Sequence, residues 1–351
     1  MIAIKMHPLT QLLPLAALAL THQPEAQLPL TPNSDLPGQP LTLDTIPLLG
    51  YGTWNLKGDN VSDAVSLAIQ TGYRHIDAAA VYGNEKDVGI GIADGLAKTG
   101  LKREDLWITS KLWNDHHGPD NVESGLAKTL SDLNLSYLDL YHMHWPVSTT
   151  SGSPEIEYLS TWDAMVTLLL SRGLVRHLGI SNFSPAQLTA LLNHTSHPPS
   201  VHQMELHPYL PQSSFLALHR DNGIHVTAYS PLAGTNPTYA PGRDDSETPL
   251  LQNPLINKIA HKRNCTPAQV SLVWGMARGT SVIPKAQHAE YIRENFDSVE
   301  GCVLKVKDLR KIDKLGVERQ HRYNNPSRSW GVPLYEGLED AGGREDYRLR
   351  K

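Results

Sequence analysis

The stretch GYRHIDAAAVYGNE, residues 72–85, begins with a strand-like run that ends at Asp77 and gives way to a loop carrying Tyr82. The same order recurs along the chain: a short apolar or β-branched run, a polar residue at its end, and a longer segment of helical periodicity. Alternation of this kind, without long antiparallel hairpins, is typical of a parallel sheet covered by helices. The sequence therefore predicts repeated strand–helix units.

Eight such units predict an α/β fold, the (β/α)8 TIM barrel. The segment at residues 41–52 is expected to form an N-terminal β-hairpin that plugs one end of the barrel, and a long C-terminal loop is expected to follow the last helix. The eight predicted strands, of which the last is the weakest, cover residues 73–77, 106–110, 138–143, 175–180, 200–205, 224–229, 280–284 and 295–299.

The alternative fold is a doubly wound open sheet, which carries a glycine-rich fingerprint after its first strand when it binds a dinucleotide. The nearest candidate is GIGIADG, residues 89–95, where Asp94 occupies the place of the third glycine and no strand lies directly before it. We therefore assign these glycines to a helix or turn and prefer the barrel.

The composition of the 351-residue chain is that of a globular protein, with 40% hydrophobic and 19% charged residues. The formal net charge is −5 and the sequence has no long basic run, which argues against nucleic acid as a partner. The two cysteines, Cys265 and Cys302, form no CxxC motif, and their number neither requires nor forbids one disulfide.

The chain divides into three predicted parts: a leader at residues 1–41, a barrel domain at 42–335 and a charged tail at 336–351. In the leader, Lys5 precedes an apolar stretch at residues 12–20, which suits a signal peptide. An interrupting proline and the polar residues that follow suit a disordered segment instead. Both interpretations stay open, and the apolar stretch is too short to span a bilayer.

Polar or chemically unusual side chains follow seven of the predicted strands. In a TIM barrel the carboxyl ends of the strands meet at the active-site mouth, so these residues are expected to lie together. In chain order they are Asp77, Tyr82, Ser110, Lys111, His142, His144, Trp145, Ser181, Asn182, Gln203, Glu205, Tyr229, Ser230, Pro284 and Lys285.

Four of these residues are expected to form one proton-delivery unit. Asp77 and Lys111 close adjacent strands, and the carboxylate would keep the lysine charged in a partly apolar site. That charge is expected to lower the pKa of Tyr82 from about 10 toward the useful range. His144 would donate to a substrate oxygen or share the tyrosine's proton. The unit suits protonation of a carbonyl oxygen while hydride reaches the carbonyl carbon.

No metal site is expected, because no Cys or third His completes a ligand set around His142 and His144. The segment at residues 235–250, rich in Pro and Asp, is either a lid or a solvated insertion, and we favour the lid. The predicted walls of the substrate pocket are Trp54, Trp113, His144 and Trp145.

Several stretches resemble the successive signatures of the aldo-keto reductases. These stretches are GYRHIDAAAVYGNE, SKLW, LDLYHMHWP, GISNFS, HQMELHPYL, TAYSPL and SVIPK. The resemblance covers roughly residues 46–335, and RYNNPSRSWGVPLYEG resembles the family's C-terminal loop, which helps to shape the substrate pocket. It implies a TIM barrel and an NADPH-dependent carbonyl reductase in which Tyr82 donates the proton. The implied tetrad is Asp77, Tyr82, Lys111 and His144.

The resemblance also implies a cofactor site. Ser181, Asn182 and Gln203 would hold the nicotinamide carboxamide. Tyr229 would stack on the nicotinamide ring and orient it for transfer from one face. The other implied contacts are those of Ser230 and Leu232 with the pyrophosphate, of Lys285 with the adenosine 2′-phosphate, and of Glu294 and Asn295 with the adenine.

Two residues depart from the family pattern. Ala286 stands where the family usually has a hydroxyl residue, and Tyr291 stands where it often has an arginine that grips the 2′-phosphate. Arg293 lies two residues further on. NADPH remains the expected cofactor because Lys285 is present, and the missing arginine leaves NADH use open.

The predicted function is reduction of an aldehyde or ketone to an alcohol by hydride transfer from NAD(P)H. Two alternatives stay open: oxidation of a polyol or alcohol by the same site, and a cofactor-binding regulatory protein with vestigial activity. The predicted partner is a small carbonyl substrate, without nucleic acid or membrane, and a monomer is favoured. NADPH use favours the cytoplasm, and the apolar leader makes secretion the alternative.

Overall fold

The computed structural model describes residues 46–58, 60–149, 157–236, 238, 248–335 and 338. The predicted leader, most of the predicted lid and nearly all of the charged tail lie outside these residues. Within these ranges, no helix is both long and apolar enough to cross a bilayer.

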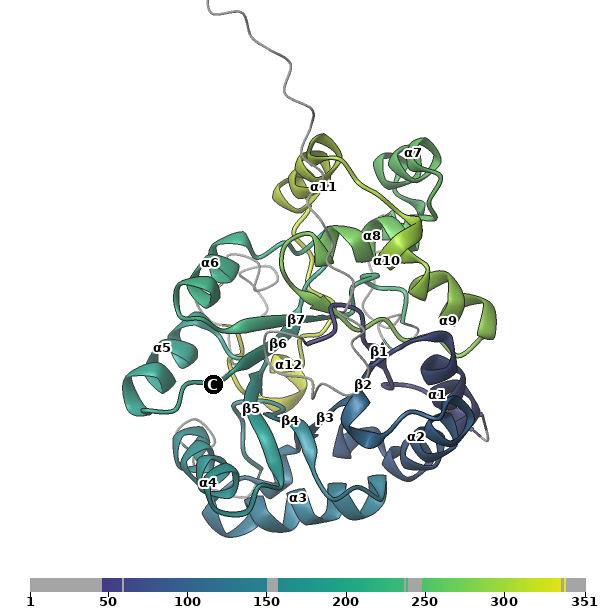
Figure 1. The fold of residues 1–351 in the computed structure, drawn as a ribbon. Coiled ribbons are helices and arrows are strands. Elements are labelled where there is room, and N and C mark those ends of the chain that lie inside the picture. The colour runs from purple at the N-terminus through teal and green to yellow at the C-terminus, as the bar shows by residue number, and fades with distance from the viewer. Residues whose placement is uncertain are drawn as a thin grey trace, which may run out of the picture.

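In the described part of the chain, eight strands form one sheet, and each pairs in parallel with the next in sequence (Figure 1). The ring closes because the Gly50 N–H donates to the Val282 carbonyl at 2.8 Å and the Gly52 N–H to the Pro284 carbonyl at 3.0 Å. The predicted (β/α)8 barrel is confirmed. The strands are β1 (Tyr51–Gly52), β2 (His75–Asp77), β3 (Trp107–Leu112), β4 (Leu138–Met143), β5 (Val175–Ser181), β6 (Val201–Glu205), β7 (His225–Tyr229) and β8 (Ser281–Val282).

Helices surround the ring of strands, and α12 lies inside that ring in the view of Figure 1. The helices are α1 (Val61–Thr71), α2 (Glu85–Thr99), α3 (Pro119–Leu133), α4 (Glu157–Arg172), α5 (Pro185–His194), α6 (Ser213–Asp221), α7 (Pro254–Arg263), α8 (Pro267–Met276), α9 (Ala289–Phe296), α10 (Ser298–Gly301), α11 (Val306–Glu318) and α12 (Ser327–Trp330). The short 3₁₀ helices are η2 (Ala80–Tyr82), η3 (Arg103–Asp105), η4 (Asn114–His116) and η6 (Leu250–Gln252).

The glycines of residues 89–95 lie inside α2, as the sequence predicted. A Cβ atom at Gly89 would come within 2.4 Å of the Leu133 carbonyl oxygen, and one at Gly91 within 2.5 Å of the Ser62 carbonyl oxygen. These glycines therefore allow α2 to pack closely on α1 and on the end of α3.

Two predictions about strands need correction. Residues 295–299, predicted as the eighth strand, instead form the end of α9, the turn at Asp297 and the start of α10. The missing strand is β1, which lies in the segment predicted as a hairpin and pairs in parallel with β2. Residues 41–45 of that segment lie outside the described part. A strand of two residues is too short for its periodicity to be recognised, whereas residues 289–296 carry an amphipathic helix.

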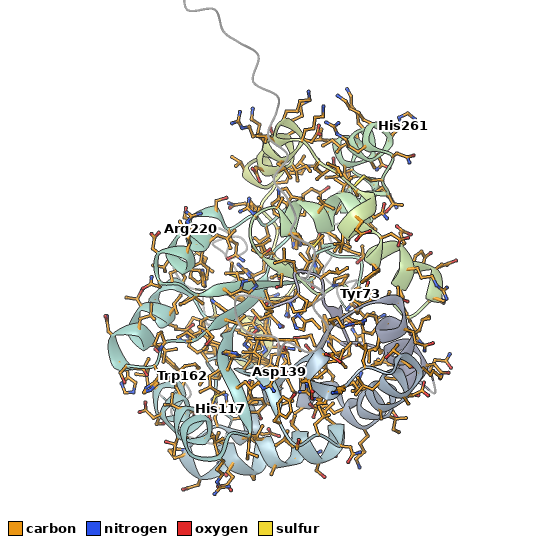
Figure 2. The ribbon with its side chains drawn as sticks, viewed as in Figure 1. Tyr73, His117, Asp139, Trp162, Arg220 and His261 are labelled. Carbon is orange, nitrogen blue, oxygen red and sulfur yellow. A yellow bond between two sulfur atoms is a disulfide. The ribbon has the colours of Figure 1, made fainter. Side chains whose placement is uncertain are left out.

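A buried carboxylate aligns the strands that carry the site. Asp139 of β4, labelled in Figure 2, is fully buried and accepts hydrogen bonds from Arg103 at 2.8 Å and from Arg176 of β5 at 2.9 Å. It also accepts from the Ile108 N–H of β3 at 2.9 Å. One side chain thus fixes β3, β4 and β5 side by side.

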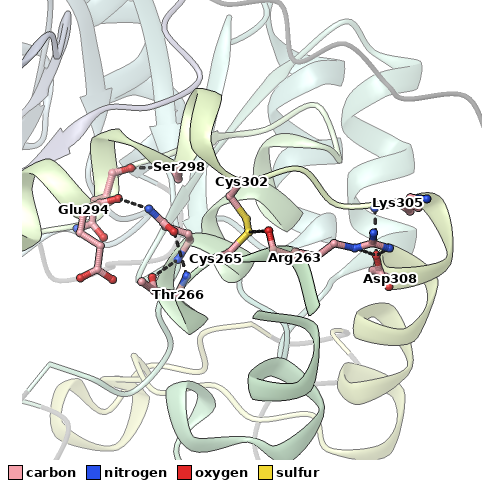
Figure 3. The surroundings of a disulfide bond; sticks show 10 residues. Arg263, Cys265, Thr266, Glu294, Ser298, Cys302, Lys305 and Asp308 are labelled. Atoms are coloured by element: carbon pink, nitrogen blue, oxygen red, sulfur yellow. Dashed lines mark hydrogen bonds and ion pairs between the residues drawn. A yellow bond between two sulfur atoms is a disulfide. The ribbon is translucent and has the colours of Figure 1, made fainter. Parts of the chain in front are cut away.

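Cys265 and Cys302 form a disulfide, a pairing that the sequence left open. It joins the residue before the N-cap of α8 to the segment after α10, with 5.4 Å between the Cα atoms (Figure 3). Beside it, the Gln269 side chain donates to the Glu294 carbonyl at 2.9 Å. The bond and its neighbours therefore tie α8 to α9 and α10.

Candidate active site

The carboxyl ends of β2 and β3 bring the predicted acid–base residues together. Lys111 Nζ donates to Asp77 Oδ2 at 2.6 Å and to the Ala78 carbonyl at 2.8 Å. It also lies 3.2 Å from the hydroxyl of Tyr82, which η2 places above it. Both charged side chains are buried. The three partners satisfy the ammonium, as a buried charge requires.

His144 follows β4 and faces the same phenol. Its ring lies edge-on to Tyr82, with centroids 5.8 Å apart, and edge-on to Trp113 at 5.2 Å. Its backbone N–H donates to the Leu112 carbonyl at 3.1 Å, and its carbonyl accepts from Asn182 Nδ2 at 2.9 Å. The four predicted tetrad side chains therefore meet at one mouth of the barrel.

The direction of the Tyr82 pKa corrects the sequence prediction. We expected Lys111 to lower it, but burial, together with the Asp77 and Glu85 carboxylates, raises the pKa of Tyr82 well above its ordinary value of 10.0. Burial also lowers the pKa of Lys111, against the opposing pull of Asp77. Desolvation of the buried phenol is the largest cause, and the two carboxylates add to it. The resting phenol therefore holds its proton.

His144 is held neutral. Burial, and then the charge of Lys111, lowers the pKa of His144 well below its ordinary value of 6.5. A neutral imidazole carries one N–H, so His144 can donate one hydrogen bond to an oxygen in the mouth. The mouth thus offers an O–H donor and an N–H donor side by side.

The amides predicted to hold the nicotinamide are connected to the acid–base residues. Gln203 Nε2 donates to Asp77 Oδ1 at 2.7 Å. Asn182 occupies a turn after β5 with a φ of 63°, and its Oδ1 accepts from the hydroxyls of Tyr229 at 2.7 Å and Tyr335 at 3.1 Å. These bonds join the ends of β2, β5, β6 and β7.

A cavity of about 330 Å³ opens at this mouth. Lys111 and Ser181 are buried and do not line it, and neither do Glu294 and Asn295. The described residues contain no group of three or more His, Cys, Asp or Glu side chains that could hold a metal ion. The predicted site residues that line the cavity are Trp54, Asp77, Tyr82, Trp113, His144, Trp145, Asn182, Gln203, Tyr229, Ser230, Leu232 and Lys285.

Three further residues of the site were not predicted individually: Asn324, Trp330 and Tyr335. Asn324 Nδ2 donates to the Tyr229 hydroxyl at 3.2 Å, and the Trp330 ring lies edge-on to Trp145 with centroids 5.0 Å apart. The sequence marked their segment only as a pocket-shaping loop. The aromatic and amide residues of this segment were the available signal. Which of them face the pocket depends on the path of the loop, which the sequence does not give.

Comparison with known proteins agrees with this geometry. The model of the aldo/keto reductase family matches residues 48–317. The chain belongs to the aldo/keto reductase family. As a member it is an NAD(P)H-dependent oxidoreductase, and its aldehyde and aldose reductase relatives support carbonyl reduction as its general activity.

Individual relatives span most of the chain. It is 42% identical to an uncharacterized oxidoreductase of Schizosaccharomyces pombe, covering 84% of this chain and 92% of the relative. It is 38% identical to a D/L-glyceraldehyde reductase of Hypocrea jecorina, covering 86% and 96%. The structure of the aldose reductase from Schistosoma japonicum matches with a TM-score of 0.74 and 34% identity, covering 84% of this chain and 96% of that one.

Glu85, the last residue of the stretch at 72–85, is a buried carboxylate next to this site. It accepts hydrogen bonds from the Ser110 hydroxyl at 2.6 Å and the Thr129 hydroxyl at 3.2 Å. Burial, opposed by these two hydroxyls, raises the pKa of Glu85 to about 7. A carboxyl group whose pKa is raised on folding favours the fold at low pH and loses that contribution as the pH rises through 7.

We predict that Glu85→Gln stabilises the protein at pH 8 by about 3 kcal/mol relative to wild type, and much less at pH 5. The glutamine can still accept from Ser110 but carries no charge to bury. Denaturant unfolding at both pH values measures the difference. Glu104→Gln, in the partly exposed η3, is the control and should show no such pH dependence. An equal effect of Glu85→Gln at both pH values would contradict the account.

Proposed function

We propose that this aldo/keto reductase reduces an aldehyde or ketone to an alcohol with Tyr82 as the proton donor. The observation that supports it most is the contact of Lys111 Nζ with both Asp77 and the Tyr82 hydroxyl at the mouth of a cavity. A reduced nicotinamide cofactor, when bound, would supply the hydride to the carbonyl carbon.

The chain's own groups handle the proton. The substrate carbonyl oxygen would accept hydrogen bonds from Tyr82 and His144, both neutral donors. As negative charge develops on that oxygen, the phenol gives up its proton to it. The phenolate left behind lies beside Lys111, 3.2 Å away, and is stabilised at that moment. Asp77 keeps the lysine charged and in place throughout.

The cofactor proposal depends on the chemistry of the donor set. The Ser181 hydroxyl and the amides of Asn182 and Gln203 suit a carboxamide, which both donates and accepts hydrogen bonds. Tyr229 lines the cavity and offers an aromatic face. Ser230 and Leu232 would lie along the pyrophosphate, while Glu294 and Asn295, outside the cavity, would contact the adenine.

We propose NADPH as the preferred cofactor, with NADH accepted. Lys285 lines the cavity and is half-buried. Burial lowers the pKa of Lys285 from its ordinary value, and an anionic partner such as a phosphate would offset that shift. Tyr291 is 50% exposed where an arginine would grip the 2′-phosphate. One phosphate-binding cation in place of two predicts modest discrimination between the two cofactors.

The substrate is proposed to be a small or aromatic aldehyde. Trp54, Trp113, Trp145 and Trp330 all line the cavity, and flat apolar walls suit such a molecule. A relative named as a D/L-glyceraldehyde reductase makes glyceraldehyde a sensible first probe.

We predict that Tyr82→Phe lowers kcat for glyceraldehyde reduction by about 10²–10⁴-fold, since the phenyl ring has no proton to donate. The dissociation constant for NADPH, measured by tryptophan fluorescence quenching, should stay the same. Tyr137→Phe is the matched control, because that ring lies between Arg103 and Arg176 at the opposite end of the strands. Undiminished turnover by Tyr82→Phe would remove Tyr82 from the mechanism.

We predict that Tyr291→Arg tightens NADPH binding about tenfold and leaves NADH binding unchanged, because only NADPH carries the 2′-phosphate. Val317→Arg, which adds the same charge at an exposed position of α11, is the control. Titration of both cofactors into all three proteins measures the effect. Equal tightening for both cofactors would show that the added charge acts without contacting the 2′-phosphate.

A further inference from the structure

Glu205, at the end of β6, holds a segment that lies more than a hundred residues away in sequence. Its Oε1 accepts from the Tyr323 N–H at 2.7 Å, and its Oε2 accepts from the Asn324 N–H at 2.8 Å. His207 Nε2 lies 3.0 Å from the same Oε1. Two consecutive backbone N–H groups thus point at the two oxygens of one fully buried carboxylate.

The surroundings keep this carboxylate ionised. Burial alone would raise the pKa of Glu205, but the bond from His207, the nearby charge of Arg322 and the backbone bond from Tyr323 together lower it. An ionised carboxylate accepts stronger hydrogen bonds than a neutral one. The backbone at residues 323–324 is therefore held firmly at one place on the barrel.

The same segment is seated from its other side. A Cβ atom at Gly234, in the loop after β7, would come within 2.3 Å of the Tyr323 ring, so the ring occupies space that only glycine leaves free. The His321 N–H donates to the Tyr209 carbonyl at 3.0 Å. The C-terminal segment is thus fixed between the loops that follow β6 and β7.

The chain from residue 324 onward forms one wall of the cavity. Asn324 and Trp330 both line it. The Trp330 ring lies edge-on to Trp113 and Trp145, with centroid distances of 5.9 and 5.0 Å. Since α12 carries Trp330 only a few residues beyond the Glu205 contacts, the place of the 323–324 backbone determines where this indole stands.

We propose that Glu205 is a positioning residue that sets substrate selectivity by fixing the C-terminal segment, residues 321–335, so that Trp330 completes the aromatic wall. The inference deepens the proposed carbonyl reductase function and rests on it. The contacts of the Glu205 side chain described above include neither the tetrad nor the amides of Asn182 and Gln203, so Glu205 acts through the segment that it holds.

The first test needs no activity. Glu205→Gln replaces one acceptor oxygen by an N–H₂ group, which cannot accept from the backbone. Hydrogen exchange of the protein without substrate should then be at least about tenfold faster at whichever of the Tyr323 and Asn324 amides faces the new N–H₂ group, with β3 and β4 unchanged. Asp308→Asn, a buried carboxylate on α11, is the matched control and should not affect these amides. Unchanged exchange in Glu205→Gln would overturn the proposal.

The second test measures selectivity, as kcat/KM for benzaldehyde divided by that for glyceraldehyde. Glu205→Gln should lower this ratio about tenfold, mainly through KM for benzaldehyde. Gly234→Ala displaces the Tyr323 ring without removing a buried charge, so it should also lower the ratio. If Glu205→Gln fails to fold, this second variant tests the proposal. Glu205→Asp, which keeps the charge, should restore part of the ratio.

The outcomes separate the two proposals. An unchanged ratio in both folded variants, with wild-type turnover intact, overturns the role of Glu205 and leaves the reductase proposal standing. A wild-type protein that reduces neither aldehyde with either cofactor sinks the proposed function, and the exchange measurement still decides whether Glu205 fixes the segment.

Discussion

The buried ion pair of Asp77 and Lys111 is the interaction on which the site depends. Taking two charges out of water costs several kcal/mol per ion, so such a pair persists only when its remaining hydrogen-bonding positions are filled. Here the Ala78 carbonyl and the Tyr82 hydroxyl accept the other hydrogen bonds of the Lys111 ammonium. The Gln203 amide donates to the second oxygen of the Asp77 carboxylate. Two of these partners, Tyr82 and Gln203, are also groups that the proposed function uses.

From this pair the network extends in two directions. Toward the proposed cofactor site, Gln203 connects the pair to the end of β6, and Asn182 connects His144 to Tyr229. Toward the substrate side, the C-terminal segment contacts Tyr229 through Asn324. A substitution on one side of the mouth should therefore affect residues on the other side, because neighbouring residues share the same hydrogen-bond partners.

The barrel and the composition of the site could be predicted because both follow from the order of strands, helices and polar residues along the chain. Polar residues at the ends of parallel strands must meet at one mouth, which is why Asp77 and Lys111 could be paired from the sequence. The first strand could not be found, because Tyr51–Gly52 is too short to show periodicity. The sign of the Tyr82 pKa depends on burial, which the sequence does not contain. The contacts of Trp330 depend on the path of a loop, which no local pattern fixes.

The most direct test of the central claim is a double-mutant cycle on Asp77 and Lys111, read as kcat/KM for glyceraldehyde with NADPH. Asp77→Asn and Lys111→Met should each lower kcat/KM by at least about a hundredfold, and the double variant should be no worse than the poorer single one, because groups that act as a unit fail together. Losses that multiply in the double variant would contradict the account, since the two residues would then act independently.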